Sequence, residues 1–277
     1  MVAVPPRLDG TILLVRHGES TWVAEGRIQG RADPPLSDLG RRQAALVAAR
    51  LADPAAPPPL PVPAGSPLGC WHSPLRRAAE TAGSIGDARA GLPLHADDRL
   101  REISQGEWEG LTGAEVRARY PDIRAGWRRD PVHVHAPGGE SLPEAGQRAG
   151  AFAGELLARL ADARERLPQE AAGRPPHGGG PGAFDNVEHD GKARPTVPPV
   201  PWAIVVAHEG LLRVLLLELL ALPLDAFWRF PLGLCAISIV DIRNGRQAMR
   251  AHNLLDHLAP LGATAAADAA RDRGAGL

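Results

Sequence analysis

The sequence has few cysteines, no excess of one charge and no long apolar run, and each shortage excludes a class of protein. Two cysteines in 277 residues are too few for a disulfide-stapled scaffold. The 31 basic and 32 acidic residues balance, so nothing predicts general affinity for nucleic acid or anionic membrane. The longest apolar stretch, Leu211–Leu222, contains Arg213 and Glu218 and is too short to span a bilayer. Residues 1–10 lack the features of a signal peptide, so we expect a cytoplasmic protein.

The remaining composition is typical of a protein with a large core. Hydrophobic residues make up 44% and charged residues 23% of the chain, and one α/β domain of this length is common. We therefore expect a single domain over residues 1–277. Residues 168–201 are rich in glycine and proline and show no apolar period, so we predict a mobile surface insertion there. Residues 263–277 are rich in alanine and charge, and we expect a frayed tail.

Short apolar or alternating segments alternate with helical patterns along the chain. The predicted strands are Thr11–Val15, Gly69–His72, Trp202–Ala207, Cys235–Ile242 and Gln247–His252, the last two joined by an Asn-Gly turn. The predicted helices are capped by Ser37, by the pair Ser73-Pro74, and by Ser141 with Glu144, and a fourth covers Gly210–Leu222. This alternation predicts an α/β fold, a three-layer α/β/α sandwich with a largely parallel central sheet.

Polar residues follow three of the predicted strands. Arg16–Glu19, Ser73–Arg77 and His208–Gly210 each begin where a buried strand ends. In open α/β sheets ligands bind beyond the carboxyl ends of the strands, so these segments should converge. Arginines and helix N-termini offer donors and positive charge to phosphate oxygens, which predicts an anion site.

At these positions the sequence resembles the histidine phosphatase superfamily, which includes the cofactor-dependent phosphoglycerate mutases. Short blocks in the family's order carry the resemblance across residues 11–258, apart from the insertion. They are RHGES at 16–20, QG at 29–30, PLS to QA at 35–44, SPLRRAAETA at 73–82, LRE with GEWEG at 100–110, PGGESL at 137–142 and AHEG at 207–210. RHG alone would be a weak signal, whereas the ordered set is specific.

The resemblance implies a mechanism with phosphoryl transfer through histidine. His17 would attack phosphorus with one ring nitrogen, while a backbone carbonyl binds the other nitrogen and fixes the tautomer. Arg16, Arg77 and His208 would neutralise charge on the phosphoryl oxygens. Glu102 would act as general acid and then general base, and no metal or cofactor is expected. The resemblance also assigns substrate contacts to Arg16, Gly18, Ser20, Val23, Gln29, Gly30, Arg77 and Glu209.

Several alternatives stay open for individual residues. Glu107 and Glu109 compete with Glu102 for the acid role. His133 and His135 alternate as metal ligands would, although no third ligand stands at metal-site spacing.

The resemblance is strongest to the phosphatase branch, and the expected partner is a small-molecule phosphate ester. The only lysine, Lys192, lies in the insertion, away from the place where the mutases carry a substrate lysine. Mutase-type transfer remains an alternative, because Arg128 and Arg129 could imitate the mutases' arginine pair. A phosphate-binding pseudoenzyme is another, because Val23 replaces the family's usual asparagine.

Residues 113–136 should form a cap that selects the substrate. From the family resemblance alone we also expect a homodimer. The cap's arginines indicate an anionic ligand or, equally, a solvated helical face.

Overall fold

The computed structural model describes residues 2–167 and 200–262. The predicted frayed tail lies outside these residues, as does the predicted insertion apart from Val200 and Pro201, which are buried. Among the helices described, none is both long and apolar enough to cross a membrane.

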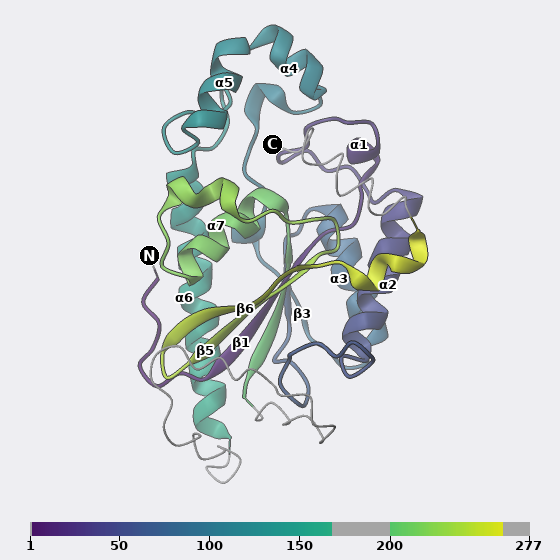
Figure 1. Ribbon diagram of the computed structural model, residues 1–277, viewed down its shortest axis with the longest axis vertical. Coiled ribbons are helices and arrows are strands. Elements are labelled where there is room, and N and C mark those ends of the chain that lie inside the picture. Colours follow the sequence, from purple (N-terminus) through teal and green to yellow (C-terminus); the bar gives the residue numbers. More distant parts are fainter. Residues whose placement is uncertain (1, 168–199, 263–277) are drawn as a thin grey trace.

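A six-stranded sheet forms the centre of the molecule (Figure 1). Its strands are β1 (Gly10–Arg16), β2 (Cys70–His72), β3 (Leu94–Ala96), β4 (Trp202–Ala207), β5 (Ile237–Arg243) and β6 (Arg246–Leu254). They lie in the order β3-β2-β4-β1-β5-β6, with parallel pairing from β3 to β1 and antiparallel pairing of β5 with both of its neighbours. The predicted, largely parallel sheet is confirmed. Sequence reasoning missed β3, because this edge strand has three exposed residues and no apolar alternation.

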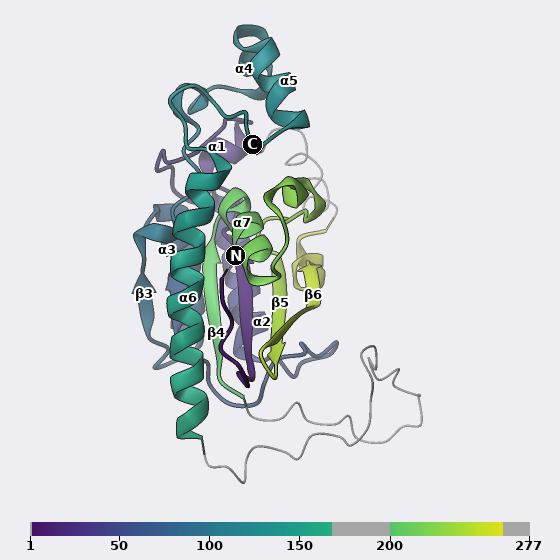
Figure 2. The same ribbon diagram turned by 90° about the vertical axis from the view of Figure 1, so that its left-hand side faces the viewer.

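Helices cover both faces of the sheet (Figure 2). The α-helices among the described residues are α1 (Thr21–Ala24), α2 (Asp38–Ala52), α3 (Arg76–Ala88), α4 (Gly113–Arg119), α5 (Pro121–Arg129), α6 (Leu142–Arg166) and α7 (Glu209–Leu219). Of these, α6 and α7 pack on one face of the sheet and α2 and α3 on the other. Single 3-10 turns are η1 (Asp98–Leu100), η2 (Gly106–Trp108), η4 (Leu224–Arg229) and η5 (Asp256–Leu261).

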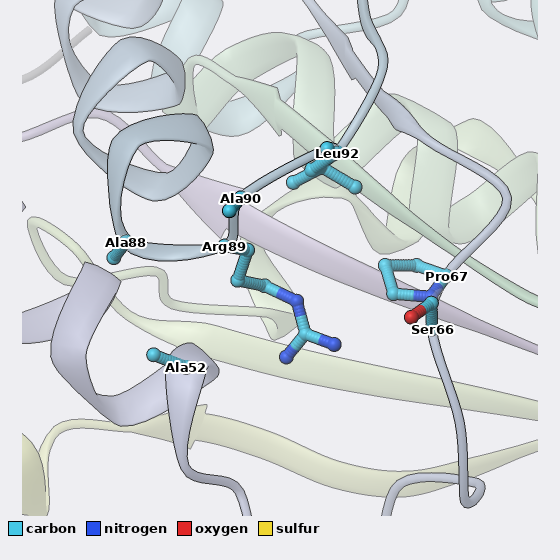
Figure 3. A pocket seen from close by; sticks show the side chains of 8 residues that line it. Ala52, Ser66, Pro67, Ala88, Arg89, Ala90 and Leu92 are labelled. Carbon is cyan, nitrogen blue, oxygen red and sulfur yellow. The ribbon is translucent and has the colours of Figure 1, made fainter.

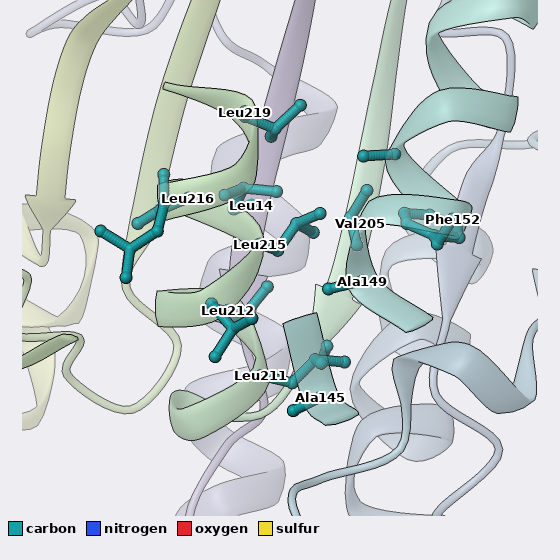
Figure 4. Packing of buried hydrophobic residues seen from close by; sticks show 14 of the residues in the cluster. Leu14, Ala145, Ala149, Phe152, Val205, Leu211, Leu212, Leu215, Leu216 and Leu219 are labelled. Atoms are coloured by element: carbon teal, nitrogen blue, oxygen red, sulfur yellow. The ribbon is translucent and has the colours of Figure 1, made fainter. Parts of the chain in front are cut away.

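Successive side chains of β1 point to opposite faces of the sheet and pack in two separate hydrophobic clusters. Ile12 and Leu14 belong to the cluster formed with α6 and α7, whereas Leu13 and Val15 belong to the cluster formed with α2 and α3. Figure 4 shows Leu14 between the leucines of α7 and the residues of α6. The sheet therefore lies between two helical layers, which confirms the α/β/α sandwich.

Helix caps and turns mostly follow the sequence. Ser37 accepts a hydrogen bond from the Gly40 amide at the start of α2, and Ser141 forms a capping box with Glu144 at the start of α6. Asn244 and the glycine after it have φ of 50° and 70°, as a tight hairpin turn requires.

Two predicted boundaries are wrong. Ser73 does not cap α3: that helix begins at Arg76 after Leu75, and the Ser73 hydroxyl instead accepts from the Leu75 amide and contacts His208. Cys235 lies before β5 with φ of 54°, so it is not part of the strand.

Helices α4 and α5 fall inside the predicted cap and lie beyond the carboxyl end of β1 (Figure 1). Trp127 of α5 is buried and meets Trp228 of η4 edge-on, with ring centroids 4.7 Å apart. It meets Trp108 in the same way at 5.9 Å. This aromatic contact joins the cap to the body of the domain.

A pocket of about 220 Å³ lies beside the carboxyl-terminal end of α3 (Figure 3). Arg89 is the one charged residue among those that line it. Its guanidinium already binds the Leu51 carbonyl and lies over the Trp202 ring. The pocket is therefore a poor candidate for binding a charged ester.

Candidate active site

His17 lies directly after β1 and is 1% exposed. Its Nδ1 is 2.6 Å from the Gly18 carbonyl oxygen, which can only accept a hydrogen bond, so Nδ1 carries the proton. Its Nε2 then holds a lone pair and accepts from Nε of Arg77 at 3.3 Å. The backbone carbonyl expected from the family mechanism is present.

The surroundings of His17 keep its imidazole neutral. Burial lowers its pKa well below the usual value, and the charges of Arg77 and Arg16 lower it further, against the opposing effect of the hydrogen bond to Gly18. A neutral imidazole with an unprotonated Nε2 is a nucleophile at neutral pH.

Arg77 is held by backbone carbonyls on the far side from His17. Its Nη1 and Nη2 donate to Ala32 and Gly30 at 2.8 and 2.9 Å. Burial lowers its pKa to about 10, a shift that the negative charge of Glu102 opposes, so the guanidinium remains a cation at neutral pH. Gly30 has φ of 50°, and a Cβ there would collide with Glu109. The position of the carbonyl that binds Arg77 therefore requires glycine at this residue.

Arg16 is 3% exposed and lies in a buried ion pair. Its Nη1 donates to the Leu232 carbonyl at 2.7 Å and is 2.8 Å from Oε2 of Glu209. The same carboxylate binds Arg213, one helical turn further along α7. Glu209, predicted as a substrate contact, therefore connects two arginines.

His208 directly follows β4 and lies against His17, with ring centroids 5.1 Å apart. Its Nε2 is 2.7 Å from the Ser73 hydroxyl, and its Nδ1 is buried without a hydrogen-bond partner among the described residues. Burial lowers the pKa of His208 well below its usual value, and nearby charges, Arg77 foremost, lower it further. A buried polar atom left unbonded is costly, so a ligand oxygen at Nδ1 would be favoured.

Glu102 is the buried member of the three candidate acids. Its Oε1 accepts from the amides of Ile103 and Leu211 at 2.9 Å each, and its Oε2 accepts from the Gly210 amide at 3.2 Å. Glu107 is exposed and binds the Tyr120 hydroxyl, while Glu109 accepts from the Arg31 amide. Burial beside the first turn of α7 distinguishes Glu102 from both.

The other predicted contacts lie in the loop around α1. Ser20 donates to Gln29 at 2.6 Å and caps α1 by accepting from the Val23 amide at 3.1 Å. The Gly18 amide donates to the Thr81 hydroxyl at 3.2 Å. Val23 is half-buried in α1. The structure thus places these residues near one another around α1.

The two cap histidines do not share a ligand set. His133 binds Asp130 at 2.9 Å, and His135 contacts the Ala136 carbonyl. Among the residues described, no group of three or more His, Cys, Asp or Glu side chains is arranged to hold a metal ion.

Sequence reasoning gave no site role to Ser73, Thr81 or Arg31. Ser73 binds His208 directly, and Thr81 binds both the Gly18 amide and the Arg77 carbonyl. Ser73 and Thr81 belong to the SPLRRAAETA block, so that block could have indicated them. Arg31 follows the QG pair, and no local pattern marks it.

A sequence profile of the histidine phosphatase superfamily (branch 1) matches residues 12–165 and 192–255. The chain belongs to the histidine phosphatase superfamily. The match spans both halves of the site, from the His17 segment to the helix after His208, so the expectation drawn from the short blocks is confirmed.

Phosphatases of this family are similar to most of the chain. Glucosyl-3-phosphoglycerate phosphatase of Mycolicibacterium vanbaalenii is 35% identical over 77% of this chain and 76% of its own length. Phosphoserine phosphatase 1 of Hydrogenobacter thermophilus is 29% identical over 89% and 93%. A probable phosphoglycerate mutase of Yersinia pestis is 32% identical over 83% and 84%. A solved mycobacterial glucosyl-3-phosphoglycerate phosphatase in complex with VO3 superimposes with a TM-score of 0.65, at 28% identity over 88% and 99%. The chain is a phosphoric monoester hydrolase of this superfamily.

Proposed function

We propose that this histidine phosphatase hydrolyses a small phosphorylated metabolite through a phosphohistidine on Nε2 of His17. The single observation that carries the proposal is the 2.6 Å contact between Nδ1 and the Gly18 carbonyl, which leaves Nε2 unprotonated. The positive charges of Arg16 and Arg77 next to this nitrogen suit a phosphoryl group.

The first step forms the Nε2–P bond and breaks the bond between phosphorus and the ester oxygen. Glu102 gives a proton to the leaving oxygen, so the alcohol departs neutral. In the second step Glu102 takes a proton from water, whose oxygen attacks phosphorus and breaks the P–N bond. Arg16, Arg77 and His208 bind the phosphoryl oxygens in both steps, and no metal or cofactor has a role.

The substrate is a small anionic ester. The names of two relatives specify glucosyl-3-phosphoglycerate and phosphoserine, both phosphate monoesters of small acids that carry a carboxylate. The cap supplies several arginines on its exposed surface, whereas Arg124 is buried over the rings of Trp108 and Trp127. The cytoplasmic location, the homodimer and the absence of nucleic-acid and membrane partners stay predictions from the sequence.

Phosphoryl transfer between sugar acids is the second candidate, and Arg128 and Arg129 at the end of α5 favour it. A mutase would convert 3-phosphoglycerate to 2-phosphoglycerate when a bisphosphate primer is added. A phosphate-binding pseudoenzyme, suggested by Val23, would bind orthovanadate and release no phosphate from any ester.

The test compares the wild-type protein with His17→Ala on p-nitrophenyl phosphate. We expect the substitution to lower kcat/KM by about 10⁴-fold or more, because it removes the nucleophile. Protein denatured in alkali during turnover of a ³²P-labelled ester should carry label on His17, because phosphohistidine survives alkali. Equal rates in the two proteins, or no label under these conditions, would overturn the proposal.

A further inference from the structure

Arg31 is a cation beside the site that the proposed mechanism does not use. It directly follows Gly30, whose carbonyl binds the Arg77 guanidinium, so its backbone adjoins the phosphate-binding arginine. The amide of Arg31 donates to Oε1 of Glu109 at 2.9 Å, which fixes the chain at this point. The side chain of Arg31 therefore starts from a rigid position at the margin of the site.

The guanidinium of Arg31 reaches toward the proposed acid. Its Nε points to the Glu102 carbonyl oxygen at 3.5 Å, a long contact, and its Nη2 is 3.3 Å from Oε1 of Glu140. The side chain is 44% exposed, whereas the phosphate-binding Arg16 and Arg77 are buried. Arg31 thus lies beside the backbone of the proposed acid and is accessible from solvent.

Glu140 does not neutralise Arg31 by itself, because it has a closer partner. Arg148 binds both oxygens of Glu140, at 2.7 and 2.8 Å, in the bidentate geometry that arginine and carboxylate favour. Arg148 also donates to the carbonyls of Arg99 and Arg101, just before Glu102. Two guanidinium groups share one carboxylate here, so the group Arg31–Glu140–Arg148 carries one net positive charge at the edge of the site.

We propose that Arg31 determines specificity by binding a carboxylate on the alcohol portion of the substrate. Glu102 protonates the ester oxygen in the proposed mechanism, so a carboxylate a few bonds from that oxygen would lie near Glu102. The Arg31 guanidinium could reach a carboxylate at this place. The inference rests on the proposed hydrolysis of a small phosphate ester and names the chemical class: phosphate monoesters of small hydroxy acids. An exposed arginine holding only a surface ion pair would contribute little to binding, and that is the competing explanation.

The test compares two phosphate esters, one with and one without a carboxylate. 3-Phosphoglycerate carries a carboxylate where glycerol 3-phosphate carries a hydroxymethyl group. We expect Arg31→Met to lower the ratio of their kcat/KM values, carboxylate over alcohol, by about 10- to 100-fold. Arg31→Lys should recover part of that ratio, because it keeps the charge and loses the fork.

Arg159→Met is the matched control. Arg159 is about half exposed and ion-paired to Glu155, and the next residue, Leu160, packs against Gly10 at the opposite end of β1. This variant also loses one positive charge, so it should leave the ratio within about twofold, since its charge is distant and screened. A ratio changed equally by Arg31→Met and Arg159→Met would overturn the assignment.

Binding measurements separate this inference from the proposed function. Calorimetric titration of His17→Ala with the same two esters, with and without Arg31→Met, reports selectivity without turnover. If no ester is hydrolysed but Arg31→Met still removes the preference for 3-phosphoglycerate, the proposed function fails and the role of Arg31 stands. If hydrolysis proceeds and neither measurement changes the ratio by more than about twofold, the role of Arg31 fails alone.

Discussion

Charged side chains are buried at the carboxyl ends of the strands, whereas in the cap they are mostly exposed. At the carboxyl ends of β1 and β4, Arg16, His17 and His208 are buried and are held by carbonyls, by each other or by a hydroxyl. In the cap, residues 113–136, charged side chains lie mostly on the exposed surface, and Arg119 pairs with Glu115 of the same helix at 3.8 Å. The phosphoryl chemistry therefore depends on a fixed scaffold, whereas the cap surface can vary without disturbing it.

Close backbone contacts leave no room for a side chain at two glycines next to the strand ends. A Cβ on Gly18 would meet the Gly40 carbonyl oxygen at 2.6 Å, and a Cβ on Gly40 would collide with the Glu19 carbonyl. The first turn of α2 therefore packs directly on the backbone that carries His17. The exposed arginines of α4 and α5 instead lie on the surface of the cap.

The largest expected effect tests the strand-end side of this comparison. Glu102→Gln removes the proton donor while keeping the size of the side chain. We expect kcat for an alkyl phosphate to fall by about 10²- to 10⁴-fold, and the rate of forming phosphohistidine from p-nitrophenyl phosphate to fall less, because nitrophenolate leaves without a proton. Rapid-quench kinetics would show phosphoenzyme accumulating.

The side-chain amide introduced by Glu102→Gln would also face a backbone N–H, since the native carboxylate accepts three of them. Thermal unfolding of the same variant therefore measures the structural cost separately. Equal losses in the rate of forming phosphohistidine from the alkyl and the aryl ester, at unchanged stability, would contradict the acid role.

The next effect tests the attachment of the cap. Trp127→Ala removes a buried ring that contacts Trp108 and Trp228, so the free energy of unfolding should fall by about 3–5 kcal/mol. Leu94→Ala, on the exposed edge strand β3, is the control and should cost far less. Denaturant titration measures both.

If the cap and the strand ends act separately, Trp127→Ala should raise KM for a metabolite ester more than it lowers kcat for p-nitrophenyl phosphate. A loss of kcat for the aryl ester as large as that in Glu102→Gln would show that the two regions cannot be separated.

The smallest effect compares a half-buried histidine of the body, His257, with an exposed histidine of the cap, His133. Burial lowers the pKa of His257, whose Nε2 binds the Cys235 carbonyl, to about 4. Between pH 6.5 and 4 the unfolded chain binds a proton there that the folded chain does not, so stability falls as the pH falls through this range. The contribution lost is up to about 3 kcal/mol.

His257→Gln should weaken this acid sensitivity, as seen in urea titrations at about pH 7.5 and about pH 4.5. His133→Gln removes an exposed histidine of the cap as a control. The same change in both variants would contradict an origin in burial of His257.

The sequence allowed the fold to be predicted where patterns are long or capped. The apolar runs of β1 and β4 and the capping box at Ser141 correspond to observed elements, because burial and local hydrogen bonds act on the same residues there. The prediction failed at Ser73, which has the sequence of a helix cap but bonds to His208, 135 residues away. Capping preference describes only neighbouring residues, so it could not predict a contact with a residue so distant in the sequence.

The residues of the site that lie in family motifs could be predicted, whereas the contacts between distant segments could not. His17, Arg77 and His208 follow from family motifs, and the structure brings them together. The ion pairs of Glu209 with Arg16 and Arg213 and the position of Arg31 did not follow, because they depend on how separate segments pack.

Glu102 is hydrogen-bonded to the amides of Gly210 and Leu211, and these two residues come just after His208 in the first turn of α7. The proposed proton-transfer group and one proposed phosphoryl ligand are therefore coupled through a single helix terminus. A substitution that displaces the first turn of α7 relative to β1 should therefore impair proton transfer and phosphoryl binding together.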